Sequence, residues 1–149
     1  MTVRVGIIGV GVMGADHARI VARETAGAKL QVLADADEMR VHALAAELGA
    51  EKAFTDPMAV INDPSVDAVL IASPDNTHQA LTLACLAARK PVLCEKPLAP
   101  TASECLAVVE AETALGRRLV QVGYMRRYDP GYADMKAACR SGDFGKAPE

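Results

Sequence analysis

Short apolar runs alternate along the chain with longer segments in which apolar residues recur every three or four positions. The clearest run is 68–72, Ala-Val-Leu-Ile-Ala, and a helical pattern follows it from Thr77 to Ala88. Short β-branched runs indicate buried strands, whereas three-to-four spacing indicates helices with one apolar face. We expect strands at 3–8, 30–34, 52–54, 68–72, 92–94 and 119–122, and helices at 13–23, 38–48, 57–61, 77–88, 102–115 and 130–140.

This alternation predicts an α/β fold, a doubly wound parallel sheet of the Rossmann type. Parallel neighbours need crossover connections, and right-handed crossovers place helices on both faces of the sheet, which gives three layers. The pattern changes after Val122. We therefore expect a Rossmann domain over residues 1–123, and residues 124–149 as the start of a connection to a further domain.

The composition agrees with this fold and excludes several functions. Hydrophobic residues make up 51% of the chain but aromatic residues only 3%, which is typical of a sheet covered by closely packed helices. The formal charge is −3 with acids and bases interleaved, so nucleic acid is disfavoured as a partner. No apolar run could span a bilayer and no signal-peptide pattern is seen, so we expect no membrane contact and a cytoplasmic location. The cysteines lack metal-ligand spacing, so we expect buried free thiols and no metal site.

A glycine motif lies between the first strand and the first helix, Gly-Val-Gly-Val-Met-Gly at 9–14. In such a loop Gly9 permits the sharp turn, Gly11 lets a pyrophosphate approach the backbone, and Gly14 lets helix and strand pack closely. The anion then lies at the helix N-terminus, where free N–H groups favour it. A glycine-rich turn without a ligand is the alternative. The residues expected at the pyrophosphate are Gly9, Gly11, Val12, Met13 and Gly14.

Asp35 follows the second strand, 21 residues beyond Gly14. An acid at about this offset bonds the adenosine ribose hydroxyls and repels a 2′-phosphate, so we predict NAD rather than NADP. The alternative is that Asp35 only starts a turn and that Asp37 caps the next helix.

Two further loops follow strands on the same side of the sheet. Ser73, Pro74, Asn76 and His78 lie after the fourth strand, where a doubly wound sheet opens its ligand crevice. They are expected to face the nicotinamide half of the cofactor, although Asn76 and His78 could equally cap the helix. Glu95, Lys96 and Pro97 follow the fifth strand and point into the same crevice. A lysine there could move a hydroxyl proton, whereas His17 on the first helix is expected to be structural.

Together these motifs resemble the glucose–fructose oxidoreductase/inositol dehydrogenase (Gfo/Idh/MocA) family. The resemblance covers nearly the whole chain, and Glu95-Lys96-Pro97 is its most specific mark; residues 120–129 look closest to the bacterial inositol 2-dehydrogenase branch. It implies oxidation of a secondary hydroxyl on a cyclic polyol or sugar by hydride transfer to NAD. Lys96 matches the catalytic lysine, Glu95 joins the cofactor contacts, and Met125 and Arg126 match positions near the substrate.

Members of this family are about twice as long, and their second domain supplies an Asp and a His for proton transfer. We therefore expect the chain to be a shortened product, a proteolytic remnant or a deliberately cut domain, with weak NAD binding and little activity alone. The complete enzyme is expected to be a homo-oligomer. A non-catalytic NAD-binding or redox-sensing module of the same fold stays open as an alternative.

Overall fold

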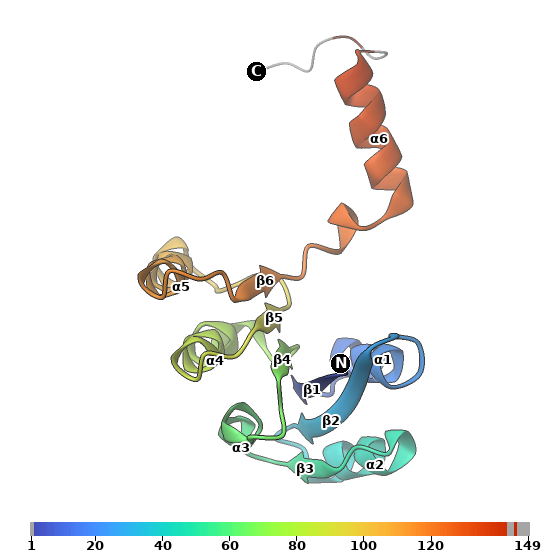
Figure 1. Ribbon diagram of the computed structural model, residues 1–149, viewed down its shortest axis with the longest axis vertical. Coiled ribbons are helices and arrows are strands. Elements are labelled where there is room, and N and C mark those ends of the chain that lie inside the picture. The colour runs from blue at the N-terminus through green and yellow to red at the C-terminus, as the bar shows by residue number, and fades with distance from the viewer. Residues whose placement is uncertain (1, 143–144, 146–149) are drawn as a thin grey trace.

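A parallel sheet forms the centre of the molecule (Figure 1). The structure is a computed structural model and describes residues 2–142 and 145. Within this part of the chain the sheet has six strands in the order β3-β2-β1-β4-β5-β6, and every neighbouring pair is parallel. The strands are β1 (Val3–Ile8), β2 (Ala28–Ala34), β3 (Lys52–Phe54), β4 (Ala68–Ile71), β5 (Val92–Cys94) and β6 (Val120–Val122). The order reverses between β1 and β4, which is where a doubly wound sheet binds its ligand.

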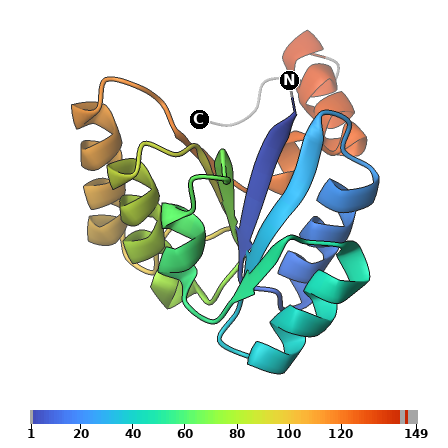
Figure 2. The ribbon, with the colours of Figure 1, turned by 60° about the horizontal axis from the view of Figure 1, so that its bottom comes forward.

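Helices cover both faces of the sheet, as Figures 1 and 2 show: α1 and α2 lie on one face, and α3, α4 and α5 on the other. The helices are α1 (Val12–Arg23), α2 (Glu38–Leu48), α3 (Pro57–Asn62), α4 (Asp75–Ala87), α5 (Ala102–Ala114) and α6 (Pro130–Ser141), with a 3₁₀ turn, η1, at Met125–Arg127. The predicted three-layer Rossmann fold is confirmed. The end of the expected 124–149 connection lies outside the described residues.

The strands are buried on both faces, so successive side chains enter different cores. Ile7 packs with Leu33 and Leu70 beneath α1 and α2, whereas Ile8 packs with Ile71 beneath α3 and α4. This explains why the strands read as continuous apolar runs rather than as an alternation of apolar and polar residues.

Local signals determine where the helices begin and end. The Asp37 side chain caps α2, and Gly49 ends that helix with a left-handed φ of 70°. Thr101 caps α5 in a capping box with Glu104. Predicted and observed ends agree within two residues, and the largest difference at the site is α4, which begins at Asp75 rather than at Thr77.

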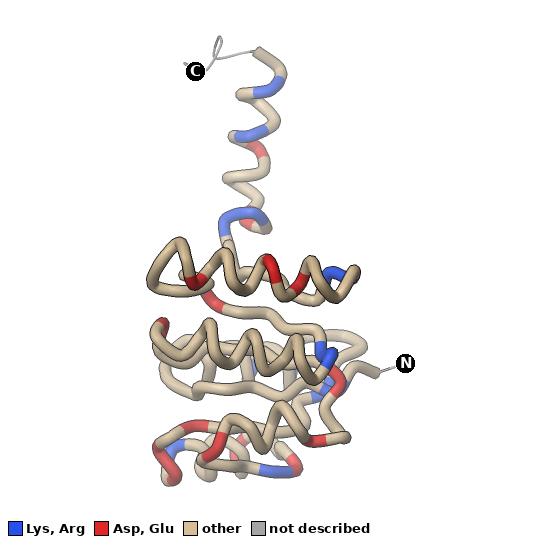
Figure 3. Tube along the Cα trace, turned by 90° about the vertical axis from the view of Figure 1, so that its left-hand side faces the viewer, with Lys and Arg blue, Asp and Glu red and all other residues tan. Residues whose placement is uncertain are grey.

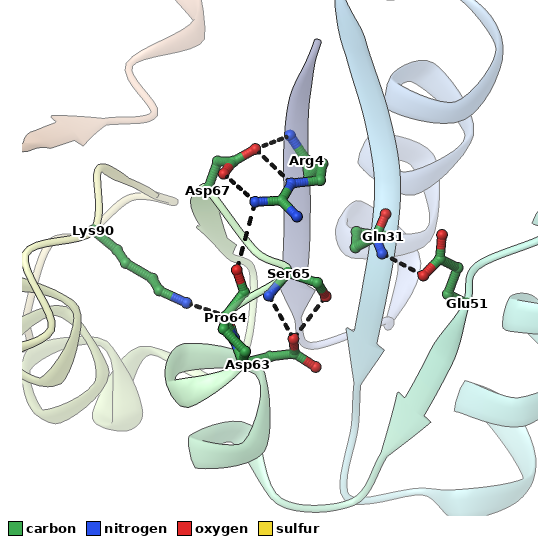
Figure 4. A network of polar contacts seen from close by, with 8 residues as sticks. All are labelled: Arg4, Gln31, Glu51, Asp63, Pro64, Ser65, Asp67 and Lys90. Atoms are coloured by element: carbon green, nitrogen blue, oxygen red, sulfur yellow. Dashed lines mark hydrogen bonds and ion pairs between the residues drawn. The ribbon is translucent and has the colours of Figure 1, made fainter.

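Ion pairs connect segments at the amino end of the sheet, and Figure 4 shows the pair of Arg4 and Asp67. Asp67 precedes β4 and accepts from the Arg4 guanidinium at 2.7 and 2.9 Å. Asp63, which is buried, accepts from Ser65 Oγ at 2.6 Å and from Lys52 Nζ at 2.7 Å. Hydrogen bonds from these donors hold the pKa of both carboxyl groups well below the ordinary aspartate value.

The expectation of buried thiols is correct for only part of the cysteines. Cys85 and Cys94 are buried, and burial raises the pKa of these thiols to about 12 and about 11. Cys105 is partly exposed, and Cys139 is exposed because α6 extends away from the sheet (Figure 1). The thiols are free, as predicted.

Figure 3 shows Lys and Arg interspersed with Asp and Glu over the face that it presents. Within the described residues, no helix is long and apolar enough to cross a membrane. In the same part of the chain, no group of three or more His, Cys, Asp or Glu side chains could hold a metal ion.

Candidate functional site

A cavity of about 520 Å³ opens at the carboxyl ends of β1, β2 and β4. This is the crevice that the strand order predicts, on the side of the sheet opposite the ion pairs of Figure 4. Its lining is largely apolar, with one carboxylate at its edge. The lining residues are Ile8, Gly9, Ala34, Asp35, Ala36, Thr55, Pro57, Ser73, Pro74, Asn76, Thr77, Ala80 and Leu81.

Two glycines of the 9–14 loop are required by the fold. Gly9 has a φ of 86°, and a Cβ there would lie 2.5 Å from the Ser73 backbone N. A Cβ at Gly14 would collide with the carbonyl oxygen of Gly9. These two positions therefore bring β1, α1 and the loop after β4 into close contact.

Gly11 differs, because neither packing nor backbone strain explains a glycine there. Its φ is −64°, and a Cβ would meet no described atom within 4 Å. It is the N-cap of α1, and among the described residues no side chain caps this helix and no acid lies in its first turn. Open space above a backbone at a free helix N-terminus fits a pyrophosphate, so the loop fits the expected dinucleotide.

Asp35 lies at the end of β2, beside the glycine loop. Its Oδ2 accepts from the Val10 N–H at 2.7 Å and its Oδ1 accepts from the Asp37 N–H at 2.9 Å. Asp37 caps α2, as the alternative held, but Asp35 does more than start a turn, since it lines the large cavity and holds the loop. Each carboxylate oxygen can accept a second hydrogen bond, which leaves capacity for ribose hydroxyls.

The loop after β4 also differs from the capping interpretation. Pro74 is the N-cap of α4, so neither Asn76 nor His78 caps the helix, because α4 begins two residues earlier than expected. Asn76 lines the large cavity. His78 is buried inside α4, with Nδ1 2.6 Å from the Pro97 carbonyl oxygen and Nε2 2.8 Å from the Ser73 carbonyl oxygen. It joins the two loops that border the crevice.

A second cavity, of about 230 Å³, borders the glycine loop at Met13. Ser73 lines both cavities. A dinucleotide has two halves joined at its pyrophosphate, and two cavities that meet beside a glycine loop match that shape. The lining residues of the second cavity are Met13, Ser73, Asp75, His78, Glu95, Lys96 and Met125.

Glu95 connects Lys96 to the rest of the domain. Its Oε1 accepts from His17 Nε2 at 2.8 Å, and its Oε2 lies 3.3 Å from the Lys96 backbone N–H. The carboxylate packs against Gly123, where a Cβ would lie 3.1 Å from it. His17 therefore contacts the lysine loop, and its structural role stays a prediction.

Lys96 is exposed and borders a third cavity, of about 430 Å³, which Met125 and Arg126 also line. The structure thus brings together the lysine and both residues expected near the substrate. The Arg126 guanidinium lies 4.8 Å from the ring centre of Tyr132 on α6.

Some lining residues were not anticipated. Thr55 and Pro57 follow β3, and Ala80 and Leu81 lie on α4, all at the large cavity. The position of Thr55 after a strand was a usable signal, because all carboxyl ends of a parallel sheet share one edge. Nothing in the sequence pattern marked the α4 residues.

Comparison with known proteins gives the same picture. The family model GFO_IDH_MocA, described as an oxidoreductase family with an NAD-binding Rossmann fold, matches residues 3–124. Inositol 2-dehydrogenase 1 of Saccharopolyspora erythraea is 58% identical over 146 residues, which are 97% of this chain and 43% of that protein. The inositol 2-dehydrogenase of Acidothermus cellulolyticus is 49% identical over 144 residues, 97% of this chain and 42% of the relative.

Among solved structures, the myo-inositol dehydrogenase of Lactobacillus casei in complex with NAD(H) and myo-inositol superposes with a TM-score of 0.92 at 32% identity. The match covers 97% of this chain and 43% of that chain. This chain therefore spans less than half the length of the relatives that it matches.

Proposed function

Because the chain belongs to the Gfo/Idh/MocA oxidoreductase family and is its NAD-binding Rossmann domain, we propose that it forms the cofactor half of an NAD-dependent polyol dehydrogenase. The proposed reaction is oxidation of a secondary hydroxyl of a cyclic polyol such as myo-inositol. The observation that carries it is the position of Lys96, which borders both the second cavity and the cavity of Met125 and Arg126.

The two cavities support a proposed position for each half of the cofactor. The adenosine half lies in the large cavity with its ribose at Asp35, and the pyrophosphate lies over Gly11 at the start of α1. The nicotinamide half lies in the second cavity, between Met13 and Lys96. Of the residues expected at the nicotinamide half, Ser73, His78 and Glu95 line the second cavity. Pro74 and Asn76 line the large cavity instead, so their expected position is corrected to the adenosine side.

Lys96 is the proposed catalytic residue. Bound NAD would supply, at nicotinamide C4, the acceptor for the hydride that leaves the carbinol carbon as this carbon becomes a ketone. The Lys96 amine would hydrogen-bond the reacting hydroxyl and take up its proton as the hydride leaves, and the resulting ammonium would release that proton to solvent. Glu95 and His17 keep the lysine loop in place, and Arg126 donates hydrogen bonds to other ring hydroxyls.

A thermal-shift titration with NAD, NADP and NADH tests the cofactor assignment. A specific ligand stabilises the folded state in proportion to the logarithm of its concentration, so NAD is expected to raise Tm progressively and NADP much less. Equal stabilisation by NAD and NADP contradicts the ribose assignment at Asp35.

The S. erythraea relative extends beyond the part that this chain matches, so we propose testing activity in a hybrid of this chain and the segment that follows the match. The hybrid is expected to reduce NAD with myo-inositol. Lys96→Met should lower kcat by about 10² to 10⁴-fold while NAD affinity stays within about twofold. Lys29→Met, at the other end of the sheet, is the control and should leave kcat unchanged. A hybrid that binds NAD and oxidises no polyol supports the non-catalytic module instead.

A homo-oligomeric assembly and a cytoplasmic location of the complete enzyme also stay predictions, as does the lack of nucleic acid binding. Size-exclusion chromatography with light scattering on the hybrid checks the first of these.

A further inference from the structure

An arginine stands beside the expected ribose site with its charge already paired. Arg40, in the first turn of α2, places Nη2 2.8 Å from Asp37 Oδ2 and Nη1 3.8 Å from Asp35 Oδ1. Its side chain is 50% exposed. The guanidinium therefore lies within reach of a group bound at Asp35, but two carboxylates neutralise it.

We propose that Asp37, through its ion pair with Arg40, is a specificity residue that closes the adenosine site to a 2′-phosphate. This inference rests on the proposed position of the ribose at Asp35. A 2′-phosphate there would meet two carboxylates and only one cation, so its negative charge would be repelled. Without the Asp37 charge, Arg40 is free to bind the phosphate, since a guanidinium matches phosphate oxygens in a bidentate arrangement.

The helix cap alone does not explain an aspartate at residue 37. Asp37 accepts from the Arg40 N–H at 3.0 Å as the N-cap of α2, and asparagine or serine caps a helix about equally well. Aspartate differs from these residues by a full negative charge, which lies beside the Arg40 guanidinium. Hydrogen bonds from the Arg40 backbone and side chain lower the pKa of Asp37, which keeps it charged at neutral pH.

Arg40 also explains why replacing Asp35 alone would be a weak test of cofactor preference. Asp35 holds the Val10 N–H, so its loss disturbs the loop that both NAD and NADP use. The Asp37–Arg40 pair would persist in such a variant. The informative comparison therefore varies Asp37 and Arg40 while residue 35 is kept the same.

The experiment measures Kd for NAD and NADP by calorimetric titration of this chain. Asp37→Asn should leave NAD affinity within about twofold and tighten NADP binding about fivefold, and in an Asp35→Ser background the gain for NADP should reach about tenfold. Adding Arg40→Gln should abolish both gains. Asp37→Ser, which also preserves the cap, should repeat the result if Asp37→Asn lowers Tm. Glu38→Gln removes a neighbouring charge from the same helix turn and is the matched control.

Each outcome has a separate meaning. If Asp37→Asn improves NADP binding equally with and without Arg40, or if Glu38→Gln improves it equally, the effect comes from the lower net negative charge and the proposal is overturned. It is also overturned if Asp37→Asn and Asp37→Ser leave NADP affinity unchanged. If Asp35→Ser leaves NAD affinity unchanged, the ribose does not lie at Asp35 and the proposed cofactor placement fails as well.

Discussion

The two ends of the sheet use acidic side chains in opposite ways. At the amino end, the Arg4 guanidinium binds Asp67 (Figure 4). The Lys52 ammonium binds Asp63. At the carboxyl end, Asp35 accepts from two backbone N–H groups and borders a cavity of about 520 Å³. One end holds strands together, whereas the other keeps oxygen atoms and open space available to a ligand.

Residues that stabilise the sheet and residues that border the binding cavity therefore lie at separate ends of one small domain. Parallel strands bring all their amino ends to one edge and all their carboxyl ends to the other, so the separation follows from the topology. Substitutions at the two ends should therefore affect unfolding and NAD affinity independently, except where a residue of the site is also needed for packing.

Gly14→Ala is the strongest exception and should have the largest effect. The added Cβ collides with the Gly9 carbonyl, so α1 must move away from β1. We expect a loss of about 3 kcal/mol in unfolding free energy, together with loss of NAD binding. Urea unfolding and calorimetric titration measure the two losses. Normal stability would show that α1 can shift without strain.

Asp63→Ala should reduce stability and spare binding. It leaves the Lys52 ammonium and the Ser65 hydroxyl without their buried acceptor. We expect a loss of about 2 kcal/mol, or roughly 6 °C in Tm for a domain of this size. The Kd for NAD, measured well below Tm, should stay within about twofold. A larger change in Kd would mean that the two ends are coupled.

Gly11→Ala should weaken NAD binding and leave stability nearly unchanged. No described atom lies within 4 Å of the added Cβ, so Tm should change little. The methyl group occupies the space expected for the pyrophosphate, and NAD affinity should fall about tenfold, equivalent to about 1.4 kcal/mol. An unchanged Kd would remove the pyrophosphate from this position.

Acid should weaken the amino end of the sheet. The folded-state pKa values of Asp63 and Asp67 lie below the unfolded value near 4, so the unfolded chain binds more protons as pH falls. Their stabilisation is complete above about pH 5 and is lost progressively below about pH 4. Urea unfolding at pH 6 and pH 3.5 should show this loss, and Asp67→Asn should show a smaller one. The same pH dependence in that variant would place the titrating groups elsewhere.

Most of the fold was predictable because each element carries its own signal. The pattern at 38–48 with Gly49 gave the ends of α2, and the short apolar runs at 52–54 and 92–94 matched β3 and β5. The start of α4 was misplaced because Pro74 acts as the N-cap, a role for which its side chain offers no hydrogen bond. The exposure of Cys139 was missed because a helix pattern does not say whether the sheet covers it.

The candidate site could be predicted only where a sequence motif marks a backbone conformation or the end of a strand. The glycines at 9–14 and the lysine after β5 could be found in this way, since topology brings strand ends together. Contacts between side chains could not be predicted in this way. The hydrogen bond between His17 and Glu95 joins residues 78 positions apart, and the pairing of Arg40 with Asp35 depends on how α2 packs beside β2. Such pairs follow from the packed fold rather than from local spacing.

Ser73 lies between two cavities to which different functions are proposed, cofactor selection in one and hydride transfer in the other. On one side lie the groups around Asp35 that are proposed to distinguish NAD from NADP, and on the other lies Lys96, where the chemistry is proposed. Mutations that exchange the electron carrier therefore need not touch the reacting centre, and those that change the substrate need not touch the adenosine site. A domain divided in this way can evolve its cofactor preference and its reaction as independent modules.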